Sequence, residues 1–384
     1  MGNDPSNLEV GVEMDMRNIL ERYLRPPGAG RALFSTGLQE QGRLSRQLLG
    51  VRSLDDEQLF EAWRAQHLRL NMGGNAILGL PFDTGSGSRR GSAEGPNAML
   101  RFFANEGSLT PEAYRAFQGA ALVGDVRVVP QLLHDDACSA DVLREVRRAL
   151  YDDPTCDDPV APLSVAEEAA RRVMQRHSQV RLIALIGDHS GSYAIARASI
   201  ERARRLGQKL GVVHFDAHTD MVDYRLGVKW AYSTWAYWVL QELHDPRAFV
   251  QIGIRATTKS QAQWQAERGM TQFWAPECLE RGADAIADDT IAALKAAGVD
   301  VVHIDWDIDG LDAAEAPATG TPEPGGYSAG FGMRVTERIG AHFPVVSGVM
   351  AEVAPFLADR NGARRTLNNA CELVACMMRA PFPT

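Results

Sequence analysis

The sequence has no apolar run of the ~20 residues that a transmembrane helix needs, and no excess of positive charge. Its formal net charge is −9, whereas a surface that binds nucleic acid is normally basic. Cysteine is scarce, and the five cysteines form no C-x-x-C pair, which favours reduced thiols. The polar, acidic start MGNDPSNLEVGVEMD shows no signal peptide. We therefore expect a cytoplasmic protein with neither a membrane nor a nucleic acid as its partner.

Residues 1–70 are predicted to form an N-terminal helical extension. Apolar side chains recur at helical spacing in residues 16–24 and 55–70, and the segment PPGAG separates the two stretches. Asp55 or a neighbouring residue is expected to cap the second helix. We expect this extension to serve packing or oligomer contacts, and we place the catalytic domain in residues 71–384.

From Asn75 onward, short apolar runs end in polar or glycine-rich loops and alternate with helical stretches. Continuous apolar runs of this kind are typical of a parallel sheet that helices cover on both faces. The runs are residues 76–80, 121–126, 181–189, 209–218, 249–254, 299–307 and 346–355. The sequence therefore predicts an α/β fold with a mainly parallel central sheet, whose ligands bind at the carboxyl ends of the strands.

Acidic and histidine residues fall where three of these runs end. HFDAHTD at 214–220 and DWDIDGLD at 305–312 both place ligand-type residues two apart, and such side chains point the same way from an extended backbone. IGDHS at 186–190 adds a histidine. The candidate metal ligands are His189, Asp216, His218, Asp220, Asp307 and Asp309. Clustered carboxylates need a counter-charge, so we expect these residues to hold metal ions rather than to form a turn.

Four carboxylates and two imidazoles suit two divalent cations better than one. Oxygen and imidazole ligands without thiolate favour Mn, Ni, Fe, Co or Zn and disfavour a structural zinc. Two ions that share a water lower the pKa of that water to about 7 and so make a nucleophile at neutral pH. The expected chemistry is hydrolysis.

These motifs, with their order along the chain, resemble the ureohydrolase family of arginases and agmatinases. The matches run through most of the chain after residue 75 and also include LPFDTGSGSRRGSAEGPNAMLR at 80–101, VGDV at 123–126, DIDGLDAAEAPATGTPEPGG at 307–326 and MAEVAP at 350–355. The resemblance implies a three-layer α/β/α fold and a centre of two divalent ions that hydrolyses a guanidinium carbon. It also implies a homotrimer or homohexamer, and a hetero-oligomer with a paralogue stays open.

The resemblance also assigns roles. It implies that His189, Asp216, Asp220 and Asp307 hold one ion and that Asp216, His218, Asp307 and Asp309 hold the other. Glu352 would face the guanidinium nitrogens, because a carboxylate pairs well with a fork of N–H donors. Asp309 would accept a proton and pass it to the leaving nitrogen.

The chain departs from the family pattern beside these ligands. Tyr232 lies near the position of the usual proton-shuttle histidine and is a candidate substitute for it. Asp305 replaces the usual serine two residues before Asp307, and adds negative charge near a cationic substrate or a metal ligand. Trp306 adds bulk, and Ala354 replaces an asparagine.

Three tryptophans, Trp230, Trp235 and Trp238, crowd one short segment. They form either ordinary core packing or an aromatic wall around a compact or methylated cation, since aromatic faces attract such groups. On the second interpretation Trp235 and Trp306 contact the substrate. His214 and His303 lie inside apolar runs and are expected to be satisfied core histidines.

Together these features resemble the guanidine hydrolase branch of the family, in which nickel rather than manganese is implied. We expect a hydrolase that acts on guanidine, a methylated guanidine or a biguanide such as metformin. The alternatives are an agmatinase or guanidino-acid hydrolase, and a non-catalytic scaffold subunit of a hetero-oligomer.

Overall fold

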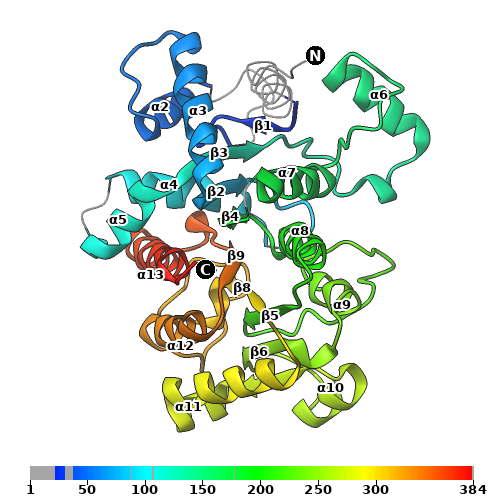
Figure 1. Ribbon diagram of the computed structural model, residues 1–384, viewed down its shortest axis with the longest axis vertical. Coiled ribbons are helices and arrows are strands. Elements are labelled where there is room, and N and C mark those ends of the chain that lie inside the picture. The colour runs from blue at the N-terminus through cyan, green and yellow to red at the C-terminus, as the bar shows by residue number, and fades with distance from the viewer. Residues whose placement is uncertain (1–21, 31–37, 88, 106–107, 177, 383–384) are drawn as a thin grey trace, which may run out of the picture.

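The computed structural model describes residues 22–30, 38–87, 89–105, 108–176 and 178–382. Within them the chain builds a nine-stranded sheet of order β1-β3-β2-β4-β9-β8-β5-β6-β7 (Figure 1). All neighbouring strands pair in parallel except β1, which is antiparallel to β3. The strands are β1 Leu24–Arg25, β2 Gly74–Leu80, β3 Ala121–Val126, β4 Val180–Ile186, β5 Leu210–Phe215, β6 Phe249–Ile254, β7 Thr271–Trp274, β8 Val301–Asp307 and β9 Val345–Ala351.

Every apolar run that was predicted as a strand contains one. The runs at 121–126 and 249–254 coincide with β3 and β6, and the others are one to four residues longer or shorter at an end. The sequence did not predict β1 and β7, which form the two edges of the sheet. The mainly parallel sheet is thus confirmed, with an antiparallel strand at one edge.

Helices cover both faces of the sheet and complete the predicted three-layer α/β/α fold. In Figure 1, α7, α8 and α9 lie to the right of the sheet, and α4, α13 and α12 lie to its left. The helices are α2 Leu38–Leu48, α3 Asp56–Arg69, α4 Gly95–Asn105, α5 Pro111–Gly119, α6 Ala140–Tyr151, α7 Pro162–Arg176, α8 Ser192–Arg205, α9 Trp235–Leu240, α10 Gln261–Arg268, α11 Ala275–Ala296, α12 Ala329–His342 and α13 Arg360–Arg379. Among the described residues, no helix combines the length and apolar character that crossing a bilayer requires.

The central strands are mostly apolar because each buries both of its faces. In β4, Leu182 and Ala184 face the cluster that includes α7 and α8, whereas Ile183 and Leu185 face the cluster that includes α4 and α13. All four side chains are fully buried. This two-sided burial favours polar ligands at the strand ends, where we look for the site.

The N-terminal extension packs on the edge of the same sheet. β1 pairs with β3, and α3 places Trp63 Nε1 and His67 Nε2 at 2.7 Å from the carbonyl oxygen of Val123 in β3. Asp55 caps α3 by accepting the N–H of Glu57, as predicted. Most of the first predicted helix, residues 16–24, lies outside the described residues, and its last residue, Leu24, is in β1. The domain boundary at residue 70 stays a prediction.

A buried arginine joins the C-terminal helix to the other end of the sheet. The Arg181 guanidinium donates to the carbonyl oxygens of Val345, Met378, Ala380 and Pro381 at 2.6–2.8 Å. Burial lowers the pKa of Arg181 to about 10. We expect Arg181→Met to lower the free energy of unfolding by roughly 3–5 kcal/mol, because several buried carbonyl groups lose their donor.

Urea unfolding followed by circular dichroism measures this loss. Arg115→Met is the control, since Arg115 on α5 is exposed and forms an ion pair with Glu112, three residues before it in the same helix. The control is expected to change the free energy of unfolding by less than about 0.5 kcal/mol. Equal effects of the two substitutions would show that Arg181 has no such role.

Candidate metal centre

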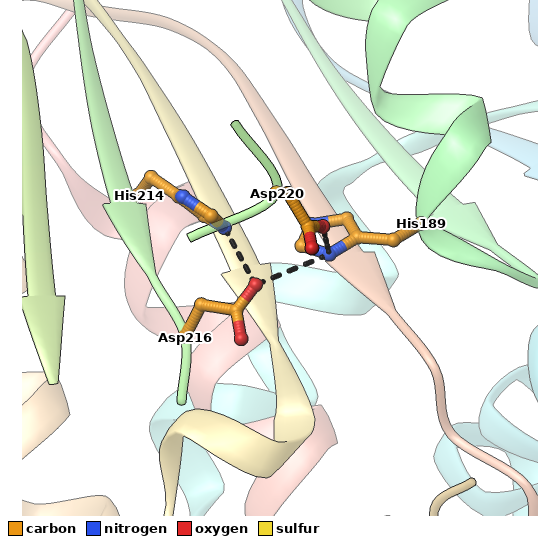
Figure 2. Close-up of side chains that lie close together, drawn as sticks. All are labelled: His189, His214, Asp216 and Asp220. Atoms are coloured by element: carbon orange, nitrogen blue, oxygen red, sulfur yellow. Dashed lines mark hydrogen bonds and ion pairs between the residues drawn. The ribbon is translucent and has the colours of Figure 1, made fainter. Parts of the chain in front are cut away.

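Four neighbouring strands in the middle of the sheet bring the predicted ligands to one end. In the order β4-β9-β8-β5, the residues at or just after their carboxyl ends are His189, Glu352, Asp307 and Asp216. Because the four strands are parallel, these ends meet. Figure 2 shows that the carboxylates of Asp216 and Asp220 both point toward the imidazole of His189, which comes from a separate segment.

The first group of ligands surrounds the His189 imidazole. Its Nδ1 atom lies 3.1 Å from Asp220 Oδ2, 3.1 Å from Asp307 Oδ2 and 3.4 Å from Asp216 Oδ2. All four residues are buried, and Nδ1 has no hydrogen-bond partner. A buried nitrogen without a partner, facing three carboxylates, has the arrangement of a metal ligand.

The second group surrounds the His218 imidazole. Its Nδ1 atom lies 3.3 Å from Asp216 Oδ1 and 3.2 Å from Asp309 Oδ2, and the Thr321 hydroxyl donates to the same Asp309 oxygen at 2.8 Å. Asp216 therefore offers one oxygen to each group, as a bridging ligand would. Asp307 Oδ1 accepts the N–H of Asp309 at 2.9 Å, so the second bridge through Asp307 stays a prediction.

The electrostatics of the two groups fit divalent cations. Burial raises the pKa of Asp307 well above its usual value, and the charges of Asp309 and Asp216 add to the rise. Burial and then Asp216 likewise raise the pKa of Asp220. Carboxylates that repel one another at such close range are stabilised by a cation between them. The donor atoms are oxygen and imidazole nitrogen, which suit both Mn²⁺ and Ni²⁺.

His214 lies close enough to the first group to be taken for a ligand, but both of its ring nitrogens have partners. Gln251 Nε2 donates to Nδ1 at 3.0 Å, which leaves the proton of His214 on Nε2, 2.9 Å from Asp216 Oδ2. His214 therefore orients the bridging carboxylate, and the prediction of a satisfied core histidine is confirmed.

Trp235 does not contact the cavity beside the ligands, so its predicted place in the pocket wall is wrong. Its side chain is fully buried, its ring centroid lies 4.9 Å from that of His189, and Nε1 donates to Asp220 Oδ2 at 3.0 Å. The reason is its place as the first residue of α9, which turns the ring inward. Trp235 therefore holds the predicted ligands His189 and Asp220 in place without lining the cavity.

We expect Trp235→Phe to weaken the binding of one metal ion by about tenfold, because Asp220 loses the donor that orients it. Competition with a chromophoric chelator measures this affinity. Trp238→Phe is the matched control, since Trp238 Nε1 donates to the carbonyl oxygen of Asp223 at an exposed position. Equal affinities for both variants and the unsubstituted protein would refute the supporting role of Trp235.

Trp306 is also absent from the pocket, which corrects its predicted substrate contact. Its side chain is fully buried and stacks on Phe215 at 3.9 Å between ring centroids. Side chains alternate along a strand, so Trp306 points to the face opposite Asp305 and Asp307. The bulk of Trp306 fills the core beneath the site.

The cavity at the ligands has a volume of about 100 Å³. It is lined by Ser86, Gly87, Arg89, His218, Asp220, Tyr232, Asp307, Gly320, Thr321 and Glu352. Tyr232 is one of the lining residues, and its role as a substitute for the proton-shuttle histidine stays a prediction. Its backbone N–H donates to the carbonyl oxygen of Gly85 and so joins two loops around the opening.

Glu352 presents a buried carboxylate to this cavity. Oε1 accepts the backbone N–H of His189 at 3.0 Å, and Oε2 lies near Gly320. Burial raises the pKa of Glu352 to about 8, and the charge of Asp188 adds to the rise. The residue has a φ of 60°, an uncommon value for a side chain other than glycine, and such strain concentrates at functional sites.

Arg255 is a part of the site that the sequence did not predict. Its guanidinium donates to the carbonyl oxygens of Asp309, Leu311 and Glu323 at 2.7–2.9 Å. It thereby fastens the turn that carries Asp309 to the loop that carries Thr321. The only local signal was its place just after β6, at the same end of the sheet as the ligands.

Comparisons with known proteins agree with this geometry. Residues 74–379 match the model of the Arginase family. The chain is 30% identical over 290 residues to an agmatinase of Cronobacter sakazakii, covering 73% of this chain and 79% of that protein. It is 29% identical over 256 residues to a guanidinobutyrase of Pseudomonas aeruginosa, covering 66% and 70%.

Among solved structures, a hypothetical agmatinase from Burkholderia thailandensis superposes with a TM-score of 0.60 at 25% identity. The match covers 80% of this chain and 86% of that one. The family match, residues 74–379, contains strands β2 to β9 and each predicted ligand of the two groups. The chain belongs to the arginase family, the ureohydrolases that hydrolyse C–N bonds in linear amidines.

Proposed function

We propose that this protein hydrolyses a C–N bond of a compact guanidine-type cation such as guanidine, a methylated guanidine or the biguanide metformin. The observation that carries the proposal is the small cavity between the ligand groups and Glu352, of about 100 Å³. Pockets for larger organic ligands enclose roughly 300–1,000 Å³. A short substrate that places its guanidinium carbon beside the ligands therefore fits this space best.

The side chains around the cavity provide the steps of this reaction. Two divalent cations, nickel or manganese, would supply a water of lowered pKa as the nucleophile. Glu352 would bind the guanidinium nitrogens and fix the planar carbon beside the predicted ligands that line the cavity, His218, Asp220 and Asp307. Asp309 would receive a proton and pass it to the leaving nitrogen, with the Tyr232 hydroxyl as a second donor on the wall. The products are urea, or a substituted urea, and ammonia or an amine.

Arg89 supports a substrate with a single positive charge. It lies at the exposed rim of the cavity. A dication such as agmatine would bring its second charge toward this guanidinium, and like charges repel. The same Arg89 would attract a carboxylate, so a guanidino-acid hydrolase is the second candidate.

A scaffold subunit without activity is the candidate from another class. The two ligand groups argue against it, because a scaffold has no physical need for clustered buried carboxylates. We expect the enzyme to be a homotrimer or homohexamer, and a hetero-oligomer with a paralogue is a further possibility. Sedimentation of the purified protein separates these assemblies.

Steady-state kinetics after separate loading with Ni²⁺ and Mn²⁺ test the substrate. We expect the highest kcat/KM on guanidine, methylguanidines or metformin, and at least about tenfold lower values on agmatine, arginine and 4-guanidinobutyrate. Faster turnover of agmatine or arginine would contradict the proposal. Faster turnover of 4-guanidinobutyrate would favour the second candidate.

The Arg89→Gln variant sharpens this test. If guanidine is the substrate, removal of the rim charge should leave kcat/KM for guanidine within about twofold and should raise that for agmatine several-fold. If a guanidino acid is the substrate, the same change should lower kcat/KM for it by about tenfold or more, because an ion pair is lost.

A further inference from the structure

Behind His189 lies a buried chain of polar side chains that the reaction itself does not use. His189 Nε2 lies 2.8 Å from Asp305 Oδ1, and His303 Nε2 lies 3.0 Å from Asp305 Oδ2. His303 Nδ1 lies 2.8 Å from the Ser347 hydroxyl, which lies 2.7 Å from the Ser199 hydroxyl. All five residues are at most 1% exposed. The chain therefore makes its contacts without bulk water.

The contacts to Asp305 fix the protons of two histidines. An ionised carboxylate accepts hydrogen bonds but does not donate them, so His189 and His303 each carry a proton on Nε2. His189 Nδ1 is then left with a free lone pair, and it is this atom that faces Asp216, Asp220 and Asp307. Asp305 thus sets His189 in the tautomer that a metal ion requires.

Asp305 lies between His189 and His303, with one carboxylate oxygen on each ring. We propose that Asp305, itself held by His303, orients His189 so that Nδ1 faces one metal ion. Both are positioning residues, since neither lines the cavity.

Metal titration of the apoprotein tests this inference, which rests on the proposed two-metal centre. Asp305→Asn offers one acceptor oxygen where two imidazoles now donate. Calorimetric titration with Mn²⁺, and separately with Ni²⁺, should show an affinity lower by about 10–100-fold for one of the two ions. The affinity for the other ion should stay within about threefold, because His218 and its neighbours do not contact Asp305. His67→Gln, at a buried histidine far from the site, should leave both affinities unchanged.

A second pair of measurements covers a variant that fails to fold. Nitrogen NMR of the unsubstituted protein loaded with diamagnetic Zn²⁺ should show the proton of His189 on Nε2, and a proton on Nδ1 would overturn the orienting role of Asp305. His303→Gln should weaken the same ion as Asp305→Asn, and the double variant should lose less than the sum of the two single losses.

The outcomes separate this inference from the proposed function. If the unsubstituted protein binds no metal, the two-metal centre is wrong. If it binds two ions and Asp305→Asn binds both as tightly, the centre stands and the role of the His303–Asp305 pair is refuted.

Discussion

Asp216→Asn is expected to lower turnover by about a thousandfold or more and to release at least one metal ion. Asp216 Oδ2 lies in the first ligand group and Oδ1 in the second. An asparagine would direct an N–H donor at one group, so one ion would lose a ligand and meet a dipole of the wrong sign. Loss of metal-assisted catalysis costs several kcal/mol, and each 1.4 kcal/mol or so corresponds to a tenfold change in rate.

Metal content by mass spectrometry and turnover by urea release give the two readouts. Asp223→Asn is the matched control, because Asp223 is exposed and lies in the same segment of the chain. The control should keep both ions and full activity. A folded Asp216→Asn protein with two ions and unchanged turnover would show that Asp216 does not bridge.

Glu352→Gln is expected to lower kcat/KM for the guanidine substrate by about a hundredfold while the metal content stays the same. Burial raises the pKa of Glu352 to about 8, and a bound guanidinium favours its ionised form. The glutamine would keep an acceptor for the His189 N–H but could not take up this negative charge. A hydrogen bond to a charged group contributes about 1.5–3 kcal/mol, and a buried cation without its partner costs more. The loss of kcat/KM should appear whether the protein is loaded with Ni²⁺ or with Mn²⁺.

Glu323→Gln is the control for this charge change. Glu323 Oε1 lies 3.8 Å from His218 Nε2 but does not line the cavity. Its substitution should change kcat/KM by less than about threefold. If Glu352→Gln instead releases metal, the carboxylate belongs to the ligand set, and its role in substrate binding would need to be withdrawn.

The sequence predicted the central strands well because each is mostly apolar on both faces and is followed by polar residues at or soon after its end. It did not predict β7, whose residues Thr271 and Gln272 interrupt the apolar pattern, nor β1, which is only two residues long. Both are edge strands, where one side lacks a neighbour and the sequence is less constrained. Their existence depends on pairing with β6 and β3, which no local pattern encodes.

The sequence predicted those site residues that alternate within one motif at a strand end. It did not predict residues whose role depends on contacts with distant segments. Asp216, His218 and Asp220 alternate within one motif, and their convergence follows from the backbone. The same alternation places Trp306 opposite Asp307, so its absence from the pocket could have been inferred once β8 was assigned. Arg255 donates hydrogen bonds to backbone carbonyl oxygens of distant loops, and its residue type does not predict this role.

The structure gives a physical reason for the departure from the family pattern at Asp305. Asp305, where a serine was expected, contacts His189 and not the cavity. The negative charge of Asp305 therefore acts on a predicted metal ligand, which was one of the two predicted effects. It does not act on the substrate, which was the other. His303, four residues from Asp307, has both ring nitrogens in contact with polar groups, as a core histidine should. Asp305 and His303 thus hold a predicted metal ligand in place without lining the cavity.

The count of ions bound by the apoprotein tests the central claim most directly. After removal of metal with a chelator and reloading at pH 7, the account predicts two equivalents of Ni²⁺ or Mn²⁺ per chain. Guanidine turnover should rise with the binding of the second equivalent. A folded protein that binds fewer than two equivalents yet hydrolyses guanidine at full rate would contradict the two-metal centre.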